Sequence, residues 1–188
     1  MTEQLIQTGS QTVGPFFHYG LIFGGENVLV NEQTQGEHIL LEGTVYDGDG
    51  EPVPDALVEI WQADADGHFN HPADPARTQA DPHFPGFGRS DTTDNGRYHF
   101  RTVKPGVVAG NATPYINARI FSRGMLIHAV TRIYFADEAG NRDDATLNSI
   151  DGSRRHTLLA DRSDLGGLTR YRFDIHLQGD GETVFFDL

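Results

Sequence analysis

The side chains that could carry chemistry in this chain are those of His, Asp, Glu, Tyr and Arg, because the sequence contains no cysteine. The lack of cysteine excludes disulfides, thiolate metal sites and cysteine nucleophiles. The sequence also has no Walker loop, nucleophile elbow or His-Glu-x-x-His motif. His68, His71 and Asp74 form the one local group of metal-ligand types, within a polar stretch. Two histidines three residues apart in such a stretch are more often solvated than metal-bound, so we expect surface or interface histidines there.

Arg132 is the cation whose position is of most interest. It follows His128 by four residues in the segment 128–135, so strand geometry would place both side chains on one face together with Tyr134. A guanidinium in that position could bind a carboxylate through its planar fork of N–H donors. The alternation by itself favours a solvated strand face and does not establish a catalytic role.

Short alternating segments separated by turn signals dominate the sequence after residue 37. Such alternation predicts half-buried β-strands. We expect strands at 38–47, 56–62, 96–103, 115–121 and 128–135, a hairpin of 170–179 with 182–188, short helices near 144–150 and 154–159, and a long loop at 63–95. The pattern predicts a mainly β protein, an antiparallel β-sandwich with one or two short helices. We expect a single domain over residues 1–188, in which residues 1–37 form an N-terminal arm that contacts a partner.

The charge balance restricts the possible partners. Lys and Arg total 14 against 27 Asp and Glu, which gives a formal net charge of −13. Such a surface repels nucleic acid and anionic membranes, so neither is an expected partner, and a site for an anionic substrate needs local cations. No signal peptide is visible at the start, and no apolar run approaches the roughly 20 residues of a membrane span. We therefore expect a cytoplasmic protein.

Two long blocks carry a resemblance to a known family. The first covers residues 41–69 and includes the strand Val-Glu-Ile-Trp-Gln, and the second covers 88–106 and ends in Lys-Pro-Gly. Together with shorter matches at 113–124 and 131–135, these blocks resemble the intradiol ring-cleavage dioxygenases. The resemblance implies a prealbumin-like β-sandwich and the opening of catechol rings with O₂.

The same resemblance bears on the metal. Iron-bearing family members hold Fe(III) with two Tyr and two His, a ligand set in which the phenolates supply hard anionic oxygens. The matching positions here are Phe69, Val107 or Val108 (Val108 is the one we adopt), Tyr115 and Asn117. None of the four keeps its ligand type. The resemblance therefore implies that this chain binds no metal and that a partner chain carries the Fe(III).

This loss is similar to one case within the family, in which two homologous chains assemble and only the β chain retains iron. The segments 10–20 and 121–126 match the iron-free chain of such a pair better than the β chain. The resemblance implies a higher hetero-oligomer with the active site between the chains, where Gly14, Pro15 and Arg132 face the substrate. No catalytic residue is expected on this chain. The implied reaction converts 3,4-dihydroxybenzoate and O₂ to 3-carboxy-cis,cis-muconate, in the β-ketoadipate pathway of aromatic catabolism.

Two alternatives remain at this point. The core pattern at 43–60 is shared loosely with prealbumin-like modules that bind ligands without catalysis. An iron enzyme that acts alone through an unrecognised ligand set is the second alternative, and it would require iron in the isolated chain.

Overall fold

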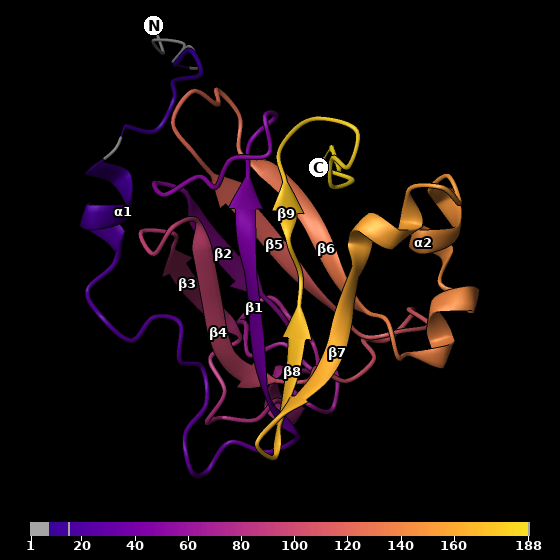
Figure 1. Ribbon diagram of the computed structural model, residues 1–188. Helices are drawn as coiled ribbons and strands as arrows, with labels where there is room; N and C mark the ends of the chain where they lie inside the picture. Colours follow the sequence, from indigo (N-terminus) through magenta and orange to yellow (C-terminus); the bar gives the residue numbers. More distant parts are fainter. Residues whose placement is uncertain (1–7, 15, 188) are drawn as a thin grey trace, which may run out of the picture.

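The computed structural model describes residues 8–14 and 16–187, and these residues form mainly β structure (Figure 1). The strands are β1 (His38–Tyr46), β2 (Leu57–Trp61), β3 (Phe87–Asp91), β4 (Arg97–Val103), β5 (Tyr115–Phe121), β6 (Ala129–Phe135), β7 (Leu159–Leu165), β8 (Leu168–Arg172) and β9 (Ile175–His176). The helices are α1 (Phe16–Leu21) and α2 (Ala145–Ser149), with 3-10 turns η1 (Arg77–Gln79), η2 (Ala139–Asp143) and η3 (Arg155–Leu158). None of the helices in the described part of the chain is long and apolar enough to cross a membrane.

The strands form one hydrogen-bonded path in the order β3-β2-β5-β6-β7-β8-β1-β4, with β9 paired to β1. Strand β7 belongs to both halves of this path. Its first residues, Leu159 and Ala160, pair with β6, whereas Asp161–Leu165 pair with β8. The path therefore folds over at β7, and in Figure 1 β1, β4 and β8 lie in front of β2 and β5.

The core lies between these two halves. Every second residue of β4 and β5 is buried, as expected for strands with one face toward a core. Phe100 of β4 and Ile116 of β5 belong to the same apolar cluster, together with Leu41, Ile60 and Ile133 from other strands. This packing of two strand layers confirms the mainly β, sandwich-like fold class.

The sheet is mixed and not purely antiparallel, because β1 pairs parallel with β8 and β9, and β6 pairs parallel with β7. A parallel pair needs a long crossover connection. Residues 136–158 supply one between β6 and β7, and they contain η2, α2 and η3.

The predicted strands within 38–135 and the helix near 144–150 are confirmed, with 115–121 at the predicted bounds. The expected strand at 182–188 is wrong for the described residues 182–187, which carry no strand. There the chain turns back, and the N–H of Thr183 donates to the carbonyl of His176 (2.9 Å). Phe185 packs against the main core, whereas Val184 and Phe186 pack on a second apolar cluster that includes Tyr115 of β5 and Tyr134 of β6. Strand β3 lies in the segment 63–95, where only a loop was expected, and β7 lies in a segment for which no strand was predicted. The short helix expected at 154–159 is the 3-10 turn η3.

The long segment between β2 and β4 is organised by one buried carboxylate. Asp64, only 4% exposed, accepts hydrogen bonds from the backbone N–H groups of Asp66 (3.0 Å), His68 (2.9 Å) and Asp81 (2.7 Å). Its own carbonyl accepts from the N–H of Gly106 (2.8 Å). Asp64 therefore ties together three stretches of chain that lie far apart in the sequence.

Replacement of this carboxylate should destabilise the fold. A hydrogen bond to a charged acceptor contributes roughly 1.5–3 kcal/mol, and Asp64→Ala removes the acceptor of three backbone N–H groups at once. We expect the free energy of unfolding to fall by about 3 kcal/mol, measured by urea denaturation. The exposed neighbour Asp66 is the control, because Asp66→Ala should change stability by less than about 0.5 kcal/mol. Equal effects of the two substitutions would contradict the role of Asp64.

Candidate functional site

The candidate site lies on the outer face of β2, β5 and β6. Ile116, Ala118 and Ile120 of β5 are buried in the core, so the alternate residues point to the opposite face. Strand register places Asn117 between Trp61 of β2 and Arg132 of β6. Tyr115, two residues before Asn117, lies opposite Tyr134.

Two of the positions where iron-bearing relatives are expected to carry a metal ligand, Phe69 and Val107 or Val108, lie in loops between strands. The ring of Phe69 stacks on Trp61, with 5.8 Å between ring centroids and 12° between ring planes. Val107 and Val108 pass so close to Gly67 that a side chain at Gly67 would overlap the carbonyl of Val107. Gly67 also has a φ of 86°, which favours glycine. Phe69 and Asn117 therefore both lie beside Trp61, whereas Val107 and Val108 lie beside Gly67.

A cleft of about 450 Å³ lies beside these residues. Its lining includes Glu59, Trp61, His71, Phe87, Asn117 and Arg119, and we call it the Trp61 cleft. The ring of His71 meets Trp61 edge-on at 5.9 Å, and its Nδ1 accepts from the N–H of Ala73 (3.2 Å). Trp61 was not among the expected site residues, although its place after a buried strand in the Val-Glu-Ile-Trp-Gln block could have indicated it.

Arg132 is half-buried on β6, where it pairs with Asn117 of β5 in the strand register. Its guanidinium carbon lies 4.2 Å from the ring centroid of Tyr115. Its Nη1 donates to the hydroxyl oxygens of Thr146 (3.2 Å) and, at the long distance of 3.5 Å, Tyr134. Within the described part of the chain these contacts include no carboxylate, so the positive charge is available for an anion.

Tyr134 is held in turn by a buried carboxylate that the sequence did not single out. Its hydroxyl donates to Asp144 (3.3 Å), and the same Oδ1 of Asp144 accepts from the N–H of Leu147 (2.9 Å) and so caps α2. Burial raises the pKa of the Tyr134 hydroxyl, and the negative charge of Asp144 adds to this effect. The hydroxyl therefore keeps its proton and presents a lone pair to Arg132.

The structure does not bring Gly14 to Arg132 within one chain. The arm lies against the β5–β6 turn, where Thr12 Oγ1 accepts from the N–H of Gly124 (2.7 Å) and the Phe17 ring lies 5.3 Å from Phe121. Phe121 is four residues along β5 from Asn117, a separation of about 13 Å in a strand. Gly14 is exposed, and Pro15 lies outside the described residues.

The residues at the positions where iron-bearing relatives are expected to carry ligands do not fit a ferric ion. Phe69 and Val108 have no donor atom, Asn117 offers only a neutral amide, and the Tyr115 ring already carries the guanidinium of Arg132. Residues 8–14 and 16–187 contain no group of three or more His, Cys, Asp or Glu that could hold a metal ion. Asp74, in the polar stretch with His68 and His71, instead accepts from the N–H of Ala76 (2.7 Å).

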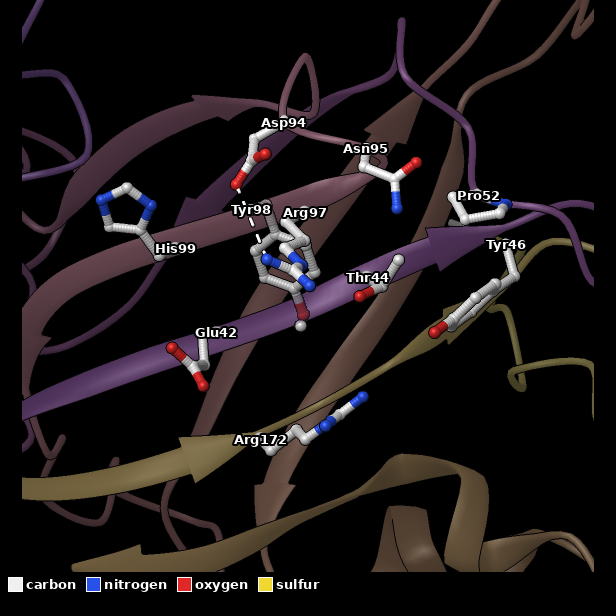
Figure 2. A pocket seen from close by; sticks show the side chains of 11 residues that line it. Glu42, Thr44, Tyr46, Pro52, Asp94, Asn95, Arg97, Tyr98, His99 and Arg172 are labelled. Carbon is white, nitrogen blue, oxygen red and sulfur yellow. Dashed lines mark ion pairs between the residues drawn. The ribbon is translucent and has the colours of Figure 1, made fainter. Parts of the chain in front are cut away.

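A second cleft, of about 470 Å³, lies on the outer face of the opposite half and is formed by β1, β4 and β8 (Figure 2). Its cations already have carboxylate partners. Arg97 pairs with Asp94 (3.9 Å) and Arg172 with Asp174 (3.0 Å). None of the expected site residues lies there, and the paired charges leave no free cation for an anionic substrate.

Comparison with known proteins shows the family of the chain. A family model described as Dioxygenase matches residues 14–179. The protocatechuate 3,4-dioxygenase alpha chain of Pseudomonas putida is 45% identical, over 98% of each chain. The chain belongs to the intradiol dioxygenase family. This intradiol dioxygenase family member is also 32% identical to the protocatechuate 3,4-dioxygenase beta chain of Burkholderia cepacia, over 93% of this chain and 77% of the relative.

Solved structures of the family share the fold. The dioxygenase domain of a dioxygenase–carbohydrate-binding fusion from Streptomyces sp. SirexAA-E has a TM-score of 0.66 at 23% identity, over 95% of this chain and 96% of that one. Catechol 1,2-dioxygenase from Acinetobacter sp. ADP1 has a TM-score of 0.63 at 25% identity, over 86% and 60%. Intradiol dioxygenases depend on iron. Because the alpha-chain match extends over nearly the whole sequence, it favours a dioxygenase subunit over a prealbumin-like binding module.

The donor set leads to a direct prediction on metal content. The chain purified alone from iron-replete cells should contain far less than one iron per chain by elemental analysis. The control is the same chain co-expressed with a homologous β chain, where we expect iron in the purified complex. Stoichiometric iron in the isolated chain would instead support an iron enzyme that acts alone.

Proposed function

We propose that this chain is the iron-free, α-type subunit of a protocatechuate 3,4-dioxygenase. The complex would cleave 3,4-dihydroxybenzoate with O₂ to 3-carboxy-cis,cis-muconate in aromatic catabolism. The observation that carries the proposal is the 45% identity to an alpha chain over 98% of both sequences. The replaced ligand positions, Phe69, Val108, Tyr115 and Asn117, support the same role.

The proposed partner is a homologous β chain that holds the Fe(III), assembled with this chain in a hetero-oligomer. The 32% identity to a beta chain supports two chains of the same fold. The bound iron would supply the site for the catechol oxygens, and this chain would supply shape and charge. We infer that this chain contributes no catalytic residue, because Phe69, Val108, Tyr115 and Asn117 stand where iron-bearing relatives are expected to carry the metal ligands.

Arg132 is the proposed substrate-facing cation. The chain has a net charge of −13, so the carboxylate of 3,4-dihydroxybenzoate needs a local positive group. Arg132 is half-buried and has no carboxylate partner among the described residues, which suits it to bind that anion. We also propose that the backbone of Gly14 and Pro15 approaches the partner's active site closely. This contribution is separate from that of Arg132.

The substitution Arg132→Ala tests this assignment in the assembled complex. A charge-assisted hydrogen bond contributes roughly 1.5–3 kcal/mol, so kcat/KM for 3,4-dihydroxybenzoate should fall about ten- to a hundred-fold. Iron content should not change. Arg97→Ala, which removes an exposed arginine from the opposite half, is the control and should leave kcat/KM unaltered. Loss of iron, or unchanged activity, in the Arg132 variant would contradict the assignment.

The role of the arm is tested by Gly14→Ala. Nothing lies within 4 Å of a Cβ added at Gly14, so the substitution should not alter the thermal unfolding of the chain itself. If Gly14 packs against the partner's site, an added methyl group costs about 1 kcal/mol or more, and kcat/KM of the complex should fall about five-fold. Gly9→Ala is the matched control, because Gly9 is equally open and lies on the same arm. Equal activity of the two variants would exclude close approach at Gly14.

A further inference from the structure

We propose that Tyr115 is a positioning residue, whose ring face holds the guanidinium of Arg132 in place for the substrate carboxylate. This inference rests on the proposed function, because it assigns the support of the proposed substrate-facing cation. Tyr115 stands at a position where iron-bearing relatives are expected to have a His ligand. In this chain the same position contacts the guanidinium of Arg132 on the neighbouring strand β6.

The contact has the geometry of a cation–π interaction. The guanidinium carbon of Arg132 lies 4.2 Å from the ring centroid of Tyr115, well inside the roughly 6 Å over which such contacts are effective. Strand register explains the contact, since Tyr115 pairs with Tyr134 and Asn117 pairs with Arg132. Tyr115 and Arg132 are therefore diagonal neighbours on one face of an antiparallel pair, within reach of long side chains.

The ring of Tyr115 is itself fixed. Tyr115 is only 8% exposed and belongs to an apolar cluster with Tyr134, Leu147 and Leu158. Its ring centroid lies 6.0 Å from that of Tyr134, with 46° between the ring planes. The guanidinium of Arg132, which lies over this packed ring, therefore loses much of its conformational freedom before any ligand binds.

The remaining contacts of Arg132 leave one edge of the guanidinium open. The hydrogen bonds to Tyr134 and Thr146 both use Nη1. Within residues 8–14 and 16–187, Nε and Nη2 of Arg132 have no hydrogen-bond acceptor. Nε–H and one N–H of Nη2 form a parallel pair of donors, which matches the two oxygens of a carboxylate.

The groups that hold Arg132 are neutral, so they leave its positive charge available. A carboxylate beside Arg132 would hold it in place but would compete with the substrate for the same donors. The Tyr115 ring and two hydroxyl groups fix the guanidinium without neutralising it. In a chain with a net charge of −13, such neutral support keeps one cation free for an anion.

The test uses the complex with its iron-bearing β chain. Tyr115→Leu removes the ring face, whereas Tyr115→Phe keeps it. We expect Tyr115→Leu to raise KM for 3,4-dihydroxybenzoate about three- to ten-fold with little change in kcat. Tyr115→Phe should behave as the unmodified complex. Catechol lacks the carboxylate, so its KM, or its inhibition constant if it turns over slowly, should not respond to either change.

A second variant and a control guard against a purely structural effect. Tyr115→Met keeps an apolar side chain of considerable length without a ring, and it should show the same KM pattern if the leucine variant fails to fold. Tyr46→Leu removes a part-buried tyrosine of the opposite half, which lines the cleft in Figure 2 and is stacked on His176. It should leave KM for both substrates unchanged. In an Arg132→Ala background, Tyr115→Leu should have no further effect on KM.

The outcomes separate this inference from the proposed function. If Arg132→Ala lowers kcat/KM but Tyr115→Leu and Tyr115→Met leave KM unchanged, the positioning role is wrong and the subunit role stands. Equal KM increases for both substrates, or loss of iron, would also overturn the positioning role, because they indicate general damage. If Arg132→Ala itself has no effect, the assignment of the substrate-facing cation fails first.

Discussion

The register of β5 between β2 and β6 is the constraint on which the candidate site depends. It buries Ile116, Ala118 and Ile120 in the core and turns the alternate residues outward. A slip of one residue would exchange the two faces, and it would place Asn117 in the core and an isoleucine at the surface. The free energy of core packing therefore fixes which side chains meet outside, including those that make no contribution to the core.

Arg132 illustrates how a strongly acidic chain can keep one usable positive charge. Many of its other arginines pair with carboxylates, as Arg89 does with Glu59 and Arg170 with Glu42. Arg132 is held by an aromatic ring and hydroxyl groups. The buried carboxylate of Asp144 accepts a hydrogen bond from the hydroxyl of Tyr134, not from Arg132, so the guanidinium keeps its charge unpaired among the described residues.

The strands with clear alternation were predictable from the sequence, and 115–121 was found at its predicted bounds. Strand β7 was missed because it pairs with β6 at one end and with β8 at the other, so its side chains follow no single alternation. The segment 182–187 shows the opposite error. Its apolar residues suggest a strand, but the described residues form none, and Val184 and Phe186 pack over Tyr134 of β6 and Leu147 of α2 while Phe185 packs on the main core. Competition between sheet pairing and packing is decided by long-range contacts that no local pattern contains.

The sequence by itself determined the mainly β class and the family resemblance, because these follow from alternation and from the long blocks at 41–69 and 88–106. It also led to the prediction that the iron ligands are replaced at Phe69, Val108, Tyr115 and Asn117. It also singled out Arg132. Only the tertiary structure decided what surrounds that arginine and where Gly14 lies relative to it. The reason is physical: residue identity states which groups a chain can offer, whereas strand register and the packing of distant segments determine which of those groups meet.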